Sequence, residues 1–215
     1  MRSLLRKNAI FFIPYIIILA FSLCLLLFFD KASIHLFINR FHSAFFDFFF
    51  KYFTHLADGF LILFIGILFF AFNKERSLFI LVSFGISSAI TQILKKVIYH
   101  EQLRPSVFFN DLSNLYIVPG VDIHGYFSFP SGHTAGAFCL ATCLVLSGSK
   151  AKLQLFLLLY ALLAAYSRMY LSQHFLVDVV VGSTIGVCSA LVVYPICYHW
   201  MLLKKIFPVE KNAGK

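Results

Sequence analysis

The sequence predicts an all-α polytopic membrane protein with six transmembrane helices and an interfacial helix between the first and the second. Of its 215 residues, 60% are hydrophobic and only 13% are charged, and 28 are Phe. A soluble domain with a polar exterior cannot be built from this composition. Several apolar runs also approach the roughly 20 helical residues that cross a hydrocarbon core of about 30 Å. The lipid bilayer is therefore the expected solvent.

Six runs are the expected transmembrane helices, and they lie at residues 9–29, 57–73, 77–98, 131–147, 153–171 and 176–200. The first run follows Arg2, Arg6 and Lys7, as the apolar region of a secretory signal would. Its 21 residues exceed that region, and no small-residue cleavage site follows. We therefore expect an uncleaved anchor.

The stretch between the first two runs has a helical pattern of its own. Apolar residues face polar ones across residues 34–55, which predicts a helix in the interface plane on the outer side. A helix packed on the protein's own bundle would show the same pattern, and in either position it would frame a lateral path for a lipid. The apolar positions are Ile34, Phe37, Ile38, Phe41, Phe45, Phe48 and Phe49, opposite His35, Asn39, Arg40, His42, Asp47 and Lys51.

The charges predict the orientation. With a cytoplasmic N-terminus, the cytoplasmic segments hold eleven of the 18 basic residues but only two of the nine acidic ones, so that side carries the whole net charge of +9. This is the positive-inside pattern, and it places both termini in the cytoplasm. Charges scattered over four short segments do not form a nucleic-acid groove, so no nucleic-acid partner is expected. The eleven are Arg2, Arg6, Lys7, Lys74, Arg76, Lys150, Lys152, Lys204, Lys205, Lys211 and Lys215.

The remaining organisation is simple. The chain shows no internal repeat, low-complexity tract or linker, so residues 1–215 are expected to form a single domain with a short cytoplasmic tail at 207–215. All five cysteines fall inside the expected spans, which excludes a disulfide framework, and their spacing does not match a zinc site. Cys139 and Cys143 share a helical face and are expected to pack as small apolar residues.

A histidine and a carboxylate lie near the outer end of the last span. His174 and Asp178 are four residues apart, so on a helix they share a face, and the carboxylate can accept a hydrogen bond from the imidazole N–H. Such a bond fixes the tautomer and leaves the other nitrogen free as a base or nucleophile. A purely structural pair has the same spacing. The buried Ser167-Arg168 upstream adds a second ionisable group at membrane depth, where such groups are costly and usually functional.

Two further clusters precede this one. Pro130-Ser131-Gly132-His133 opens an apolar helix, where backbone N–H groups, a hydroxyl and the helix dipole favour an anion. Arg104-Pro105 follows Lys95-Lys96 within the long loop region 99–130, and long loops often carry function. Guanidinium groups bind phosphate oxygens bidentately. The predicted topology brings all three clusters to the same outer side, so they indicate a phosphate site.

These motifs resemble those of the type 2 phosphatidic acid phosphatases, the membrane branch of the superfamily that includes the vanadium haloperoxidases. Two of the family's three signatures are complete: Pro130-Ser131-Gly132-His133, and Ser167-Arg168 followed by His174 and Asp178. In the first signature, six residues usually separate the lysine from the Arg-Pro. Seven separate Lys96 from Arg104 and eight separate Lys95 from it, so we prefer Lys96 and keep Lys95 as the alternative.

The resemblance implies a mechanism. His174, held by Asp178, would attack phosphorus to give a phosphohistidine, and His133 would protonate the leaving oxygen and later activate water. No metal or other cofactor is implied, because cationic side chains neutralise the phosphate and the chain lacks a carboxylate cluster for a metal. The equatorial oxygens would be held by Lys96, Arg104, Arg168, Ser131 and Gly132.

Other residues have less defined expectations. His124 and Asp122 lie in the long loop and are candidates for contact with a lipid headgroup. His35, His42, His55, His100 and His199 are expected at the interface.

Four function classes compete. A lipid phosphate phosphatase of the outer leaflet leads, with undecaprenyl diphosphate, phosphatidylglycerol phosphate, phosphatidic acid and the phosphates of lipid A as candidate substrates. A lipid phosphotransferase would use the same phosphohistidine. A haloperoxidase is disfavoured by the six spans, and an inactive lipid-binding scaffold by the complete motifs. The compact chain is typical of a bacterial inner (plasma) membrane protein with its site facing the periplasm or the exterior; the oligomeric state is open.

Overall fold

The computed structural model describes residues 2–109, 115–122 and 124–206. Within these residues the chain is helical, with no strand. The expected tail at 207–215 lies outside the described residues. The helices are α1 (Arg2–Lys7), α2 (Ala9–Phe28), α3 (Lys31–Asn39), α4 (Ala44–Phe53), η1 (Thr54–Ala57), α5 (Gly59–Phe72), α6 (Lys74–Ile93), η2 (Leu94–Ile98), α7 (Pro105–Phe108), α8 (Gly132–Leu146), α9 (Ala151–Tyr170) and α10 (Leu176–Ile206).

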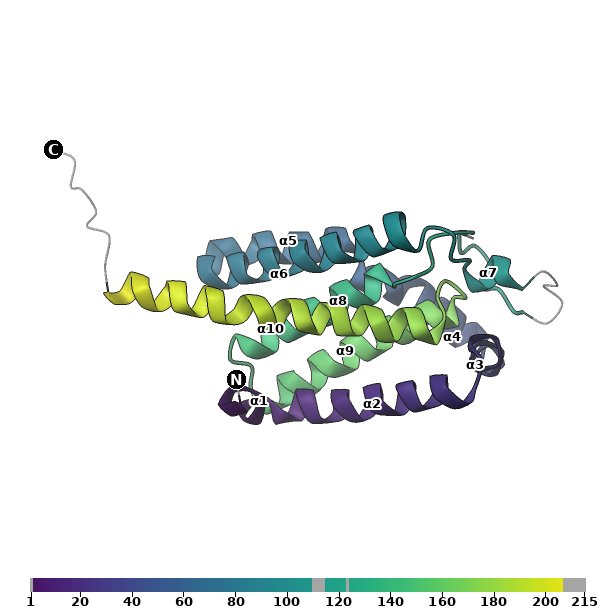
Figure 1. The fold of residues 1–215 in the computed structure, drawn as a ribbon, viewed down its shortest axis with the longest axis horizontal. Coiled ribbons are helices and arrows are strands. Elements are labelled where there is room, and N and C mark those ends of the chain that lie inside the picture. Colours follow the sequence, from purple (N-terminus) through teal and green to yellow (C-terminus); the bar gives the residue numbers. More distant parts are fainter. Residues whose placement is uncertain (1, 110–114, 123, 207–215) are drawn as a thin grey trace.

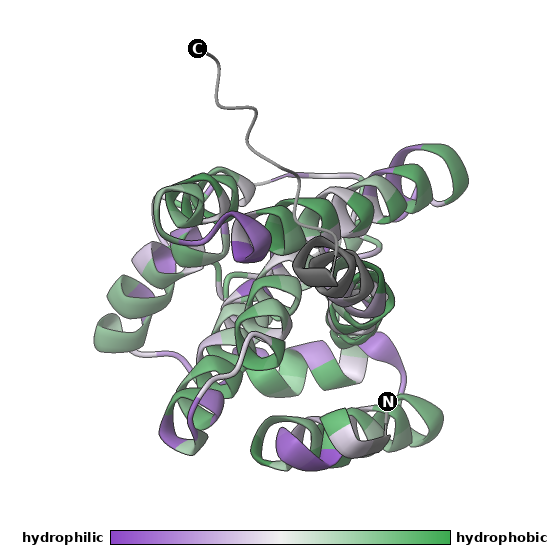
Figure 2. Ribbon diagram, turned by 90° about the vertical axis from the view of Figure 1, so that its left-hand side faces the viewer, coloured by the Kyte–Doolittle hydropathy of each residue, from purple (hydrophilic) through white to green (hydrophobic). Residues whose placement is uncertain are grey.

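The long helices form an elongated bundle with two different ends. Figure 1 shows α3, α4 and α7 at one end, and α1 with the last turns of α10 at the other. We call the first the loop end and the second the basic end. In Figure 2, which looks along the bundle, hydrophobic residues dominate the ribbons.

Four described helices are long and apolar enough to cross a membrane: α2, the continuous stretch Lys74–Ile98, α9 and residues 176–198 of α10. A fifth is obtained if Ala44–Ala57 and Gly59–Phe72, which are bent by 49°, count as one span. The predicted runs 57–73 and 131–147 correspond to shorter helices, α5 with 14 residues and α8 with 15. The structure therefore supports a polytopic membrane protein without fixing the number of spans at six.

Polar caps shorten α5. Asp58 ends the preceding turn, and its Oδ1 accepts a hydrogen bond from the backbone N–H of Phe60 at 3.2 Å. Asn73 follows α5 in an extended conformation and caps α6 by accepting a hydrogen bond from Arg76 N–H at 2.8 Å. These caps satisfy backbone groups that the helix ends leave unpaired, and they end the helix inside the apolar run.

The single interfacial helix predicted at 34–55 is wrong, because the structure forms two helices, α3 and α4. Asn39 ends α3, and its side chain pairs with both backbone groups of Tyr116: Nδ2 donates to the carbonyl and Oδ1 accepts from the N–H, each at 2.8 Å. Ser43 then caps α4 by accepting from Phe46 N–H. A contact 77 residues away along the chain therefore breaks the helical pattern.

Helix α4 fixes the loop that approaches the bundle end. The two carboxylate oxygens of Asp47 accept hydrogen bonds from the hydroxyls of Tyr116 and Tyr170, both at 2.5 Å. Lys51 donates to the carbonyl of Pro119 at 2.9 Å. Residues 115–122 are thereby attached to α4 and α9 beside the loop end of the bundle.

Helix α8 lies at the centre of the bundle, and twelve of its fifteen residues are buried. It packs against α10 backbone to backbone, because α10 presents glycines there. A Cβ at Gly182 would lie 2.5 Å from the carbonyl oxygen of Ser131, and one at Gly186 would overlap the carbonyl oxygen of Ala135. Small residues four apart are a common device for close helix packing in membranes. This contact brings the start of α8 beside the start of α10.

Candidate active site

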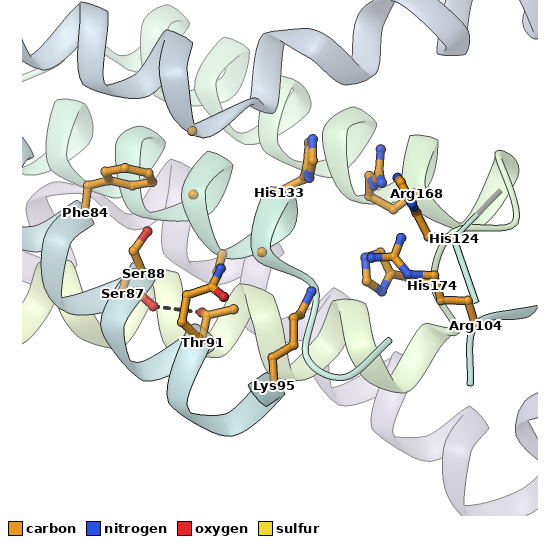
Figure 3. A pocket seen from close by; sticks show the side chains of 15 residues that line it. Phe84, Ser87, Ser88, Thr91, Lys95, Arg104, His124, His133, Arg168 and His174 are labelled. Carbon is orange, nitrogen blue, oxygen red and sulfur yellow. Dashed lines mark hydrogen bonds between the residues drawn. The ribbon is translucent and has the colours of Figure 1, made fainter. Parts of the chain in front are cut away.

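A cavity of about 300 Å³ lies at the loop end of the bundle, among α6, α8, the end of α9 and the loops. Figure 3 shows Lys95, His133, Arg168 and His174 around this space. We call it the reaction cavity. Its lining residues are Gly59, Phe84, Ser87, Ser88, Thr91, Gln92, Lys95, Arg104, His124, Gly132, His133, Ala135, Gly136, Arg168 and His174.

The lysine of this cavity is Lys95 and not the preferred Lys96. Lys96 is exposed and is absent from the lining, whereas Lys95 is half-buried and borders the cavity. Both lie in η2, a π-helical turn that ends the long α6 span. A π-turn holds more residues than an α-turn and so shifts which side chain faces the bundle, a change that residue spacing alone does not reveal.

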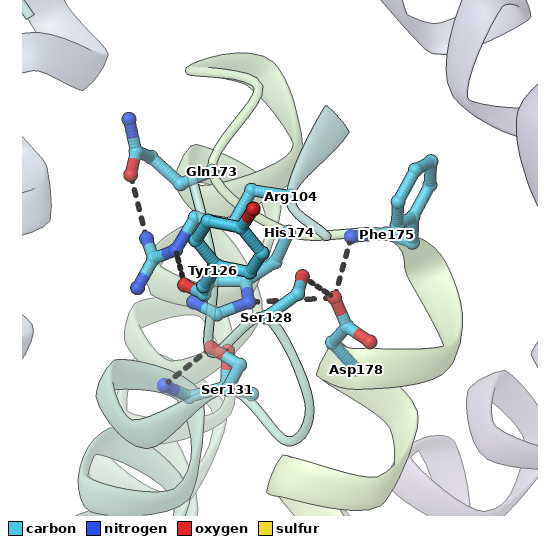
Figure 4. Close-up of polar contacts among 9 residues, drawn as sticks. Arg104, Tyr126, Ser128, Ser131, Gln173, His174, Phe175 and Asp178 are labelled. Carbon is cyan, nitrogen blue, oxygen red and sulfur yellow. Dashed lines mark hydrogen bonds and ion pairs between the residues drawn. The ribbon is translucent and has the colours of Figure 1, made fainter. Parts of the chain in front are cut away.

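Arg104 is held in one orientation by the loops. Its Nε donates to the carbonyl of Tyr126 at 3.1 Å, and its Nη1 donates to Oε1 of Gln173 at 2.7 Å (Figure 4). Gln173 is buried and also donates from Nε2 to the carbonyl of Asp122 at 2.9 Å. No sequence motif marks Gln173, yet it joins the arginine to the loop that carries Asp122.

Arg168 comes from the last turn of α9 and is buried. Its Nη1 donates to the hydroxyl of Thr54 at 2.6 Å, while its Nε has no hydrogen-bond partner among the described residues. A buried guanidinium N–H without a partner costs free energy unless a ligand accepts its hydrogen bond. Arg168 is thus placed to donate to an anion in the reaction cavity.

His174 lies in the connection between α9 and α10. Its backbone N–H donates to the carbonyl of Arg168 at 3.1 Å, and its side chain is buried. Nδ1 faces Oδ2 of Asp178 at 3.4 Å, a distance longer than an ordinary hydrogen bond. Burial lowers the pKa of His174 well below its usual value, and the charges of Lys95, Arg104 and Arg168 lower it further. The ring is therefore neutral near pH 7, as a nucleophile must be.

Asp178 links the two motif segments. It lies in the first turn of α10, which begins at Leu176, and His174 lies just before that helix. Oδ2 accepts hydrogen bonds from the Ser128 hydroxyl at 2.5 Å and from Phe175 N–H at 2.9 Å (Figure 4). Its backbone carbonyl accepts from Ser131 N–H at 3.0 Å. Ser128 has no signature in the sequence that marks this role.

The Pro-Ser-Gly-His segment begins α8, as predicted, but its serine is used differently. Ser131 is fully buried, and its Oγ lies 2.9 Å from the Thr134 hydroxyl and accepts from Thr134 N–H at 3.4 Å. Ser131 does not line the reaction cavity, whereas Gly132 and His133 do. The helix start therefore faces the cavity with Gly132 and His133.

A second cavity of about 220 Å³ adjoins the first and shares His124, His133 and Arg168 with it. His124 lines both cavities, and Asp122 lines the second one only. The predicted headgroup residues therefore lie next to the phosphate-site residues. Other residues of this second cavity are Lys51, Thr54, His55, Asp58, Gly120, Val121, Leu171 and Gln173.

The histidines that were expected at the interface lie in different environments. His35 is buried, and its Nε2 lies 3.2 Å from the Ser172 hydroxyl, so its expected interfacial position is wrong. His42 stacks on the ring of Tyr116 with centroids 3.7 Å apart. His55 and His100 are exposed. No group of three or more His, Cys, Asp or Glu side chains in the described part of the chain is placed to hold a metal ion.

Comparison with known proteins gives consistent matches. The family model of the PAP2 superfamily matches residues 76–202. A curated relative, the lipid A 4'-phosphatase of Bacteroides thetaiotaomicron, is 30% identical over 157 residues, which are 70% of this chain and 69% of the relative.

Two solved structures are similar to most of this chain. The crystal structure of Aquifex aeolicus LpxE has a TM-score of 0.68 and 30% identity, and the match covers 76% of this chain and 93% of that one. The crystal structure of a transmembrane PAP2 type phosphatidylglycerolphosphate phosphatase from Bacillus subtilis has a TM-score of 0.64 and 26% identity. This match covers 90% of this chain and 96% of that one.

Proposed function

This chain belongs to the PAP2 superfamily, and we propose that it is a bacterial membrane lipid phosphatase that hydrolyses a phosphomonoester or diphosphate lipid through a phosphohistidine. The relatives named for their substrates act on lipid A or on phosphatidylglycerol phosphate, which supports a phosphorylated lipid as the substrate. Undecaprenyl diphosphate and phosphatidic acid complete the candidate panel.

The observation that carries this proposal is the charge of the reaction cavity. Lys95, Arg104 and Arg168 line it together with His133 and His174, and none of the described residues in its lining is a carboxylate. Phosphoryl transfer places negative charge on three equatorial oxygens, and fixed cations and N–H donors around those oxygens stabilise the transition state. The cavity has this arrangement before any ligand binds.

His174 is the proposed nucleophile. Because Nδ1 faces Asp178, the other ring nitrogen, Nε2, is free to attack phosphorus as the bond to the leaving oxygen breaks. His133 gives its proton to that oxygen, so the alcohol leaves neutral. In the second step, His133 takes a proton from water, the resulting hydroxide attacks the phosphohistidine, and the N–P bond breaks to release inorganic phosphate.

The clamp consists of Arg104, Arg168, Lys95 and the N–H groups at the start of α8. Gln173 and Tyr126 fix the direction of Arg104, so the arginine loses little conformational freedom when phosphate binds. These cations perform the neutralisation that a metal would otherwise supply, so we propose that turnover needs no metal and continues with EDTA present.

The two ends of the bundle support the proposed orientation. Lys74 and Arg76 lie in the first turn of α6, and Lys150 and Lys152 lie at the start of α9. Both helix starts are at the end of the bundle opposite α3, α4 and α7 (Figure 1). With this end in the cytoplasm, the reaction cavity faces the periplasm or exterior. If α5 and α8 also cross the membrane, they complete six spans together with α2, α6, α9 and α10. Both termini would then be cytoplasmic.

The deciding experiment measures phosphate release by detergent-purified protein over lipid A, phosphatidylglycerol phosphate, phosphatidic acid and undecaprenyl diphosphate, with EDTA. The wild-type protein should release phosphate from at least one lipid, and His174→Ala should abolish release because it removes the nucleophile.

His100→Ala is the matched control, since His100 is an exposed histidine outside both cavities. Residual turnover well above background in His174→Ala would contradict the nucleophile assignment. Release that requires an added acceptor lipid would instead indicate a phosphotransferase.

A further inference from the structure

The second cavity differs from the reaction cavity in charge. Among the residues that the structure describes, the wall of the reaction cavity has three cationic side chains and no carboxylate. The second cavity combines Lys51 and Arg168 with two carboxylates, Asp58 and Asp122. The ammonium group of Lys51 already donates to the Pro119 carbonyl. The two adjoining spaces therefore suit different ligand groups.

The stereochemistry of phosphoryl transfer assigns a role to each space. The nucleophile and the leaving oxygen lie on opposite sides of phosphorus. His174 lines the reaction cavity only, whereas His133, the proposed acid, lines both cavities. A leaving group that is protonated by His133 and points away from His174 extends into the second cavity. The other arm of the reaction cavity runs along α6 to the buried ring of Phe84, deeper in the apolar bundle.

The carboxylates of Asp58 and Asp122 can accept hydrogen bonds from hydroxyl groups of a ligand. Oδ1 of Asp58 accepts from Phe60 N–H, and Oδ2 has no hydrogen-bond partner among the described residues. Asp122 is exposed; its backbone carbonyl accepts from Gln173, and its carboxylate has no hydrogen-bond partner among the described residues. Carboxylates accept hydrogen bonds from sugar or glycerol hydroxyls, and they repel a second phosphate.

We infer that the second cavity binds the leaving group, and that it selects a neutral polyhydroxyl alcohol such as a saccharide or glycerol headgroup. This inference rests on the proposed phosphatase function and narrows its substrate class to phosphomonoesters. A diphosphate lipid would place its leaving phosphate in the second cavity, where the charges of Asp58 and Asp122 offset those of Lys51 and Arg168.

The test compares kcat/KM for lipid A, phosphatidylglycerol phosphate and undecaprenyl diphosphate in one detergent. The variants are Asp58→Asn, Asp122→Asn and the double variant. Asparagine is as good a helix N-cap as aspartate, so Asp58→Asn removes the charge and keeps the cap of α5. Glu101→Gln is the control, because Glu101 is an exposed carboxylate that lines neither cavity.

The wild-type protein should prefer the monoesters. The double variant should raise kcat/KM for undecaprenyl diphosphate relative to the monoesters by about five- to tenfold, since each charge removed is worth a few-fold at short range. Preference between lipid A and phosphatidylglycerol phosphate distinguishes a saccharide from a glycerol headgroup.

The inference is overturned if the wild-type protein prefers the diphosphate, if the variants change all three lipids equally, or if Glu101→Gln has the same effect. These outcomes leave the phosphatase function intact. Failure of the wild-type protein to release phosphate from any of the lipids would instead overturn the proposed function, and this inference with it.

Discussion

The central pair α8 and α10 and the outer helices α2 and α5 are held by different forces. Twelve of fifteen residues are buried in α8, but only three of twenty in α2 and two of fourteen in α5. The outer helices present apolar side chains outward, with Leu27 and Phe60 more than four-fifths exposed. Lipid tails are as apolar as leucine, so hydropathy suffices there, whereas the central pair depends on shape. The candidate site lies at the end of the helices that depend on shape.

Gly186→Ala gives the largest expected break in this comparison. The new methyl group would overlap the carbonyl oxygen of Ala135, so α10 must move away from α8 and separate His174 from His133. Phosphate release should fall at least about 10²-fold, because displacement of about 1 Å at a reacting group has that effect. The melting temperature in detergent should fall as well.

Gly85→Ala is the control for that substitution, because a Cβ at Gly85 in α6 meets no other atom within 4 Å. Alanine is the better helix former, so this variant should keep full activity and a similar or slightly higher melting temperature. Equal damage in both variants would show that glycine matters for helix flexibility and not for close packing.

Gln173→Leu tests the polar network at the loop end. It removes the acceptor that orients Arg104 and leaves the Asp122 carbonyl without its donor. We expect kcat to fall about 10- to 100-fold, less than the loss of a clamp donor itself. Gln173→Glu keeps the acceptor for Arg104 and should recover part of kcat, because its added negative charge also opposes the phosphate.

The matched control is Gln102→Leu, an exposed glutamine of the same loop region that lines neither cavity. If Gln173→Glu is as slow as Gln173→Leu, Gln173 acts on the loop and not on Arg104.

Phe138→Ala and Phe60→Ala compare one residue type in the two regions. Phe138 in α8 is 2% exposed and packs on Tyr15, whereas Phe60 in α5 is 85% exposed. Phe138→Ala should lower the free energy of unfolding by about 2 kcal/mol, because it leaves a cavity in the packed bundle. The transfer contribution of the ring is small, since lipid is as apolar as the protein interior. Phe60→Ala should change stability by less than about 0.5 kcal/mol. Denaturant unfolding in detergent measures both, and equal losses would remove the distinction between the regions.

The smallest expected effect is a pH dependence of stability caused by His35. Helices α2 and α5 contain no His, Asp or Glu that could give such an effect. Burial lowers the pKa of His35 in α3 to about 4, below its unfolded value of 6.5. The unfolded chain therefore binds the proton first as the pH falls, so stability is full above pH 6.5 and declines toward pH 4. Between pH 6.5 and 5.5 the loss should be about 1 kcal/mol.

The measurement for His35 compares unfolding of the wild-type protein and His35→Gln across this range. Glutamine can still pair with Ser172 but does not titrate, so the difference between the two proteins should shrink as the pH falls. A constant difference would place the pH dependence in other groups.

Sequence reasoning reached the site better than it reached the fold. His133, His174, Arg104 and Arg168 were expected on one side, and the structure places them around one cavity; their catalytic roles remain predictions. The spacing Gly182-x3-Gly186 is a sequence signal for close helix packing, and the structure places both glycines against the backbone of α8. Lys95, Gln173 and Ser128 depend on a π-turn and on loop contacts, for which a single sequence gives no periodic signal.

Hydropathy, charge and residue type are properties of each segment alone, so the sequence predicted the membrane setting, the basic end of the bundle and the phosphate-binding character of the motifs. The tertiary structure decided the break between α3 and α4, the lysine of the reaction cavity and the division of the polar space into two cavities of different charge. Those features arise from contacts between residues as far apart as Asn39 and Tyr116 or Ser128 and Asp178. Such contacts form, and contribute to stability, only once the helices have packed.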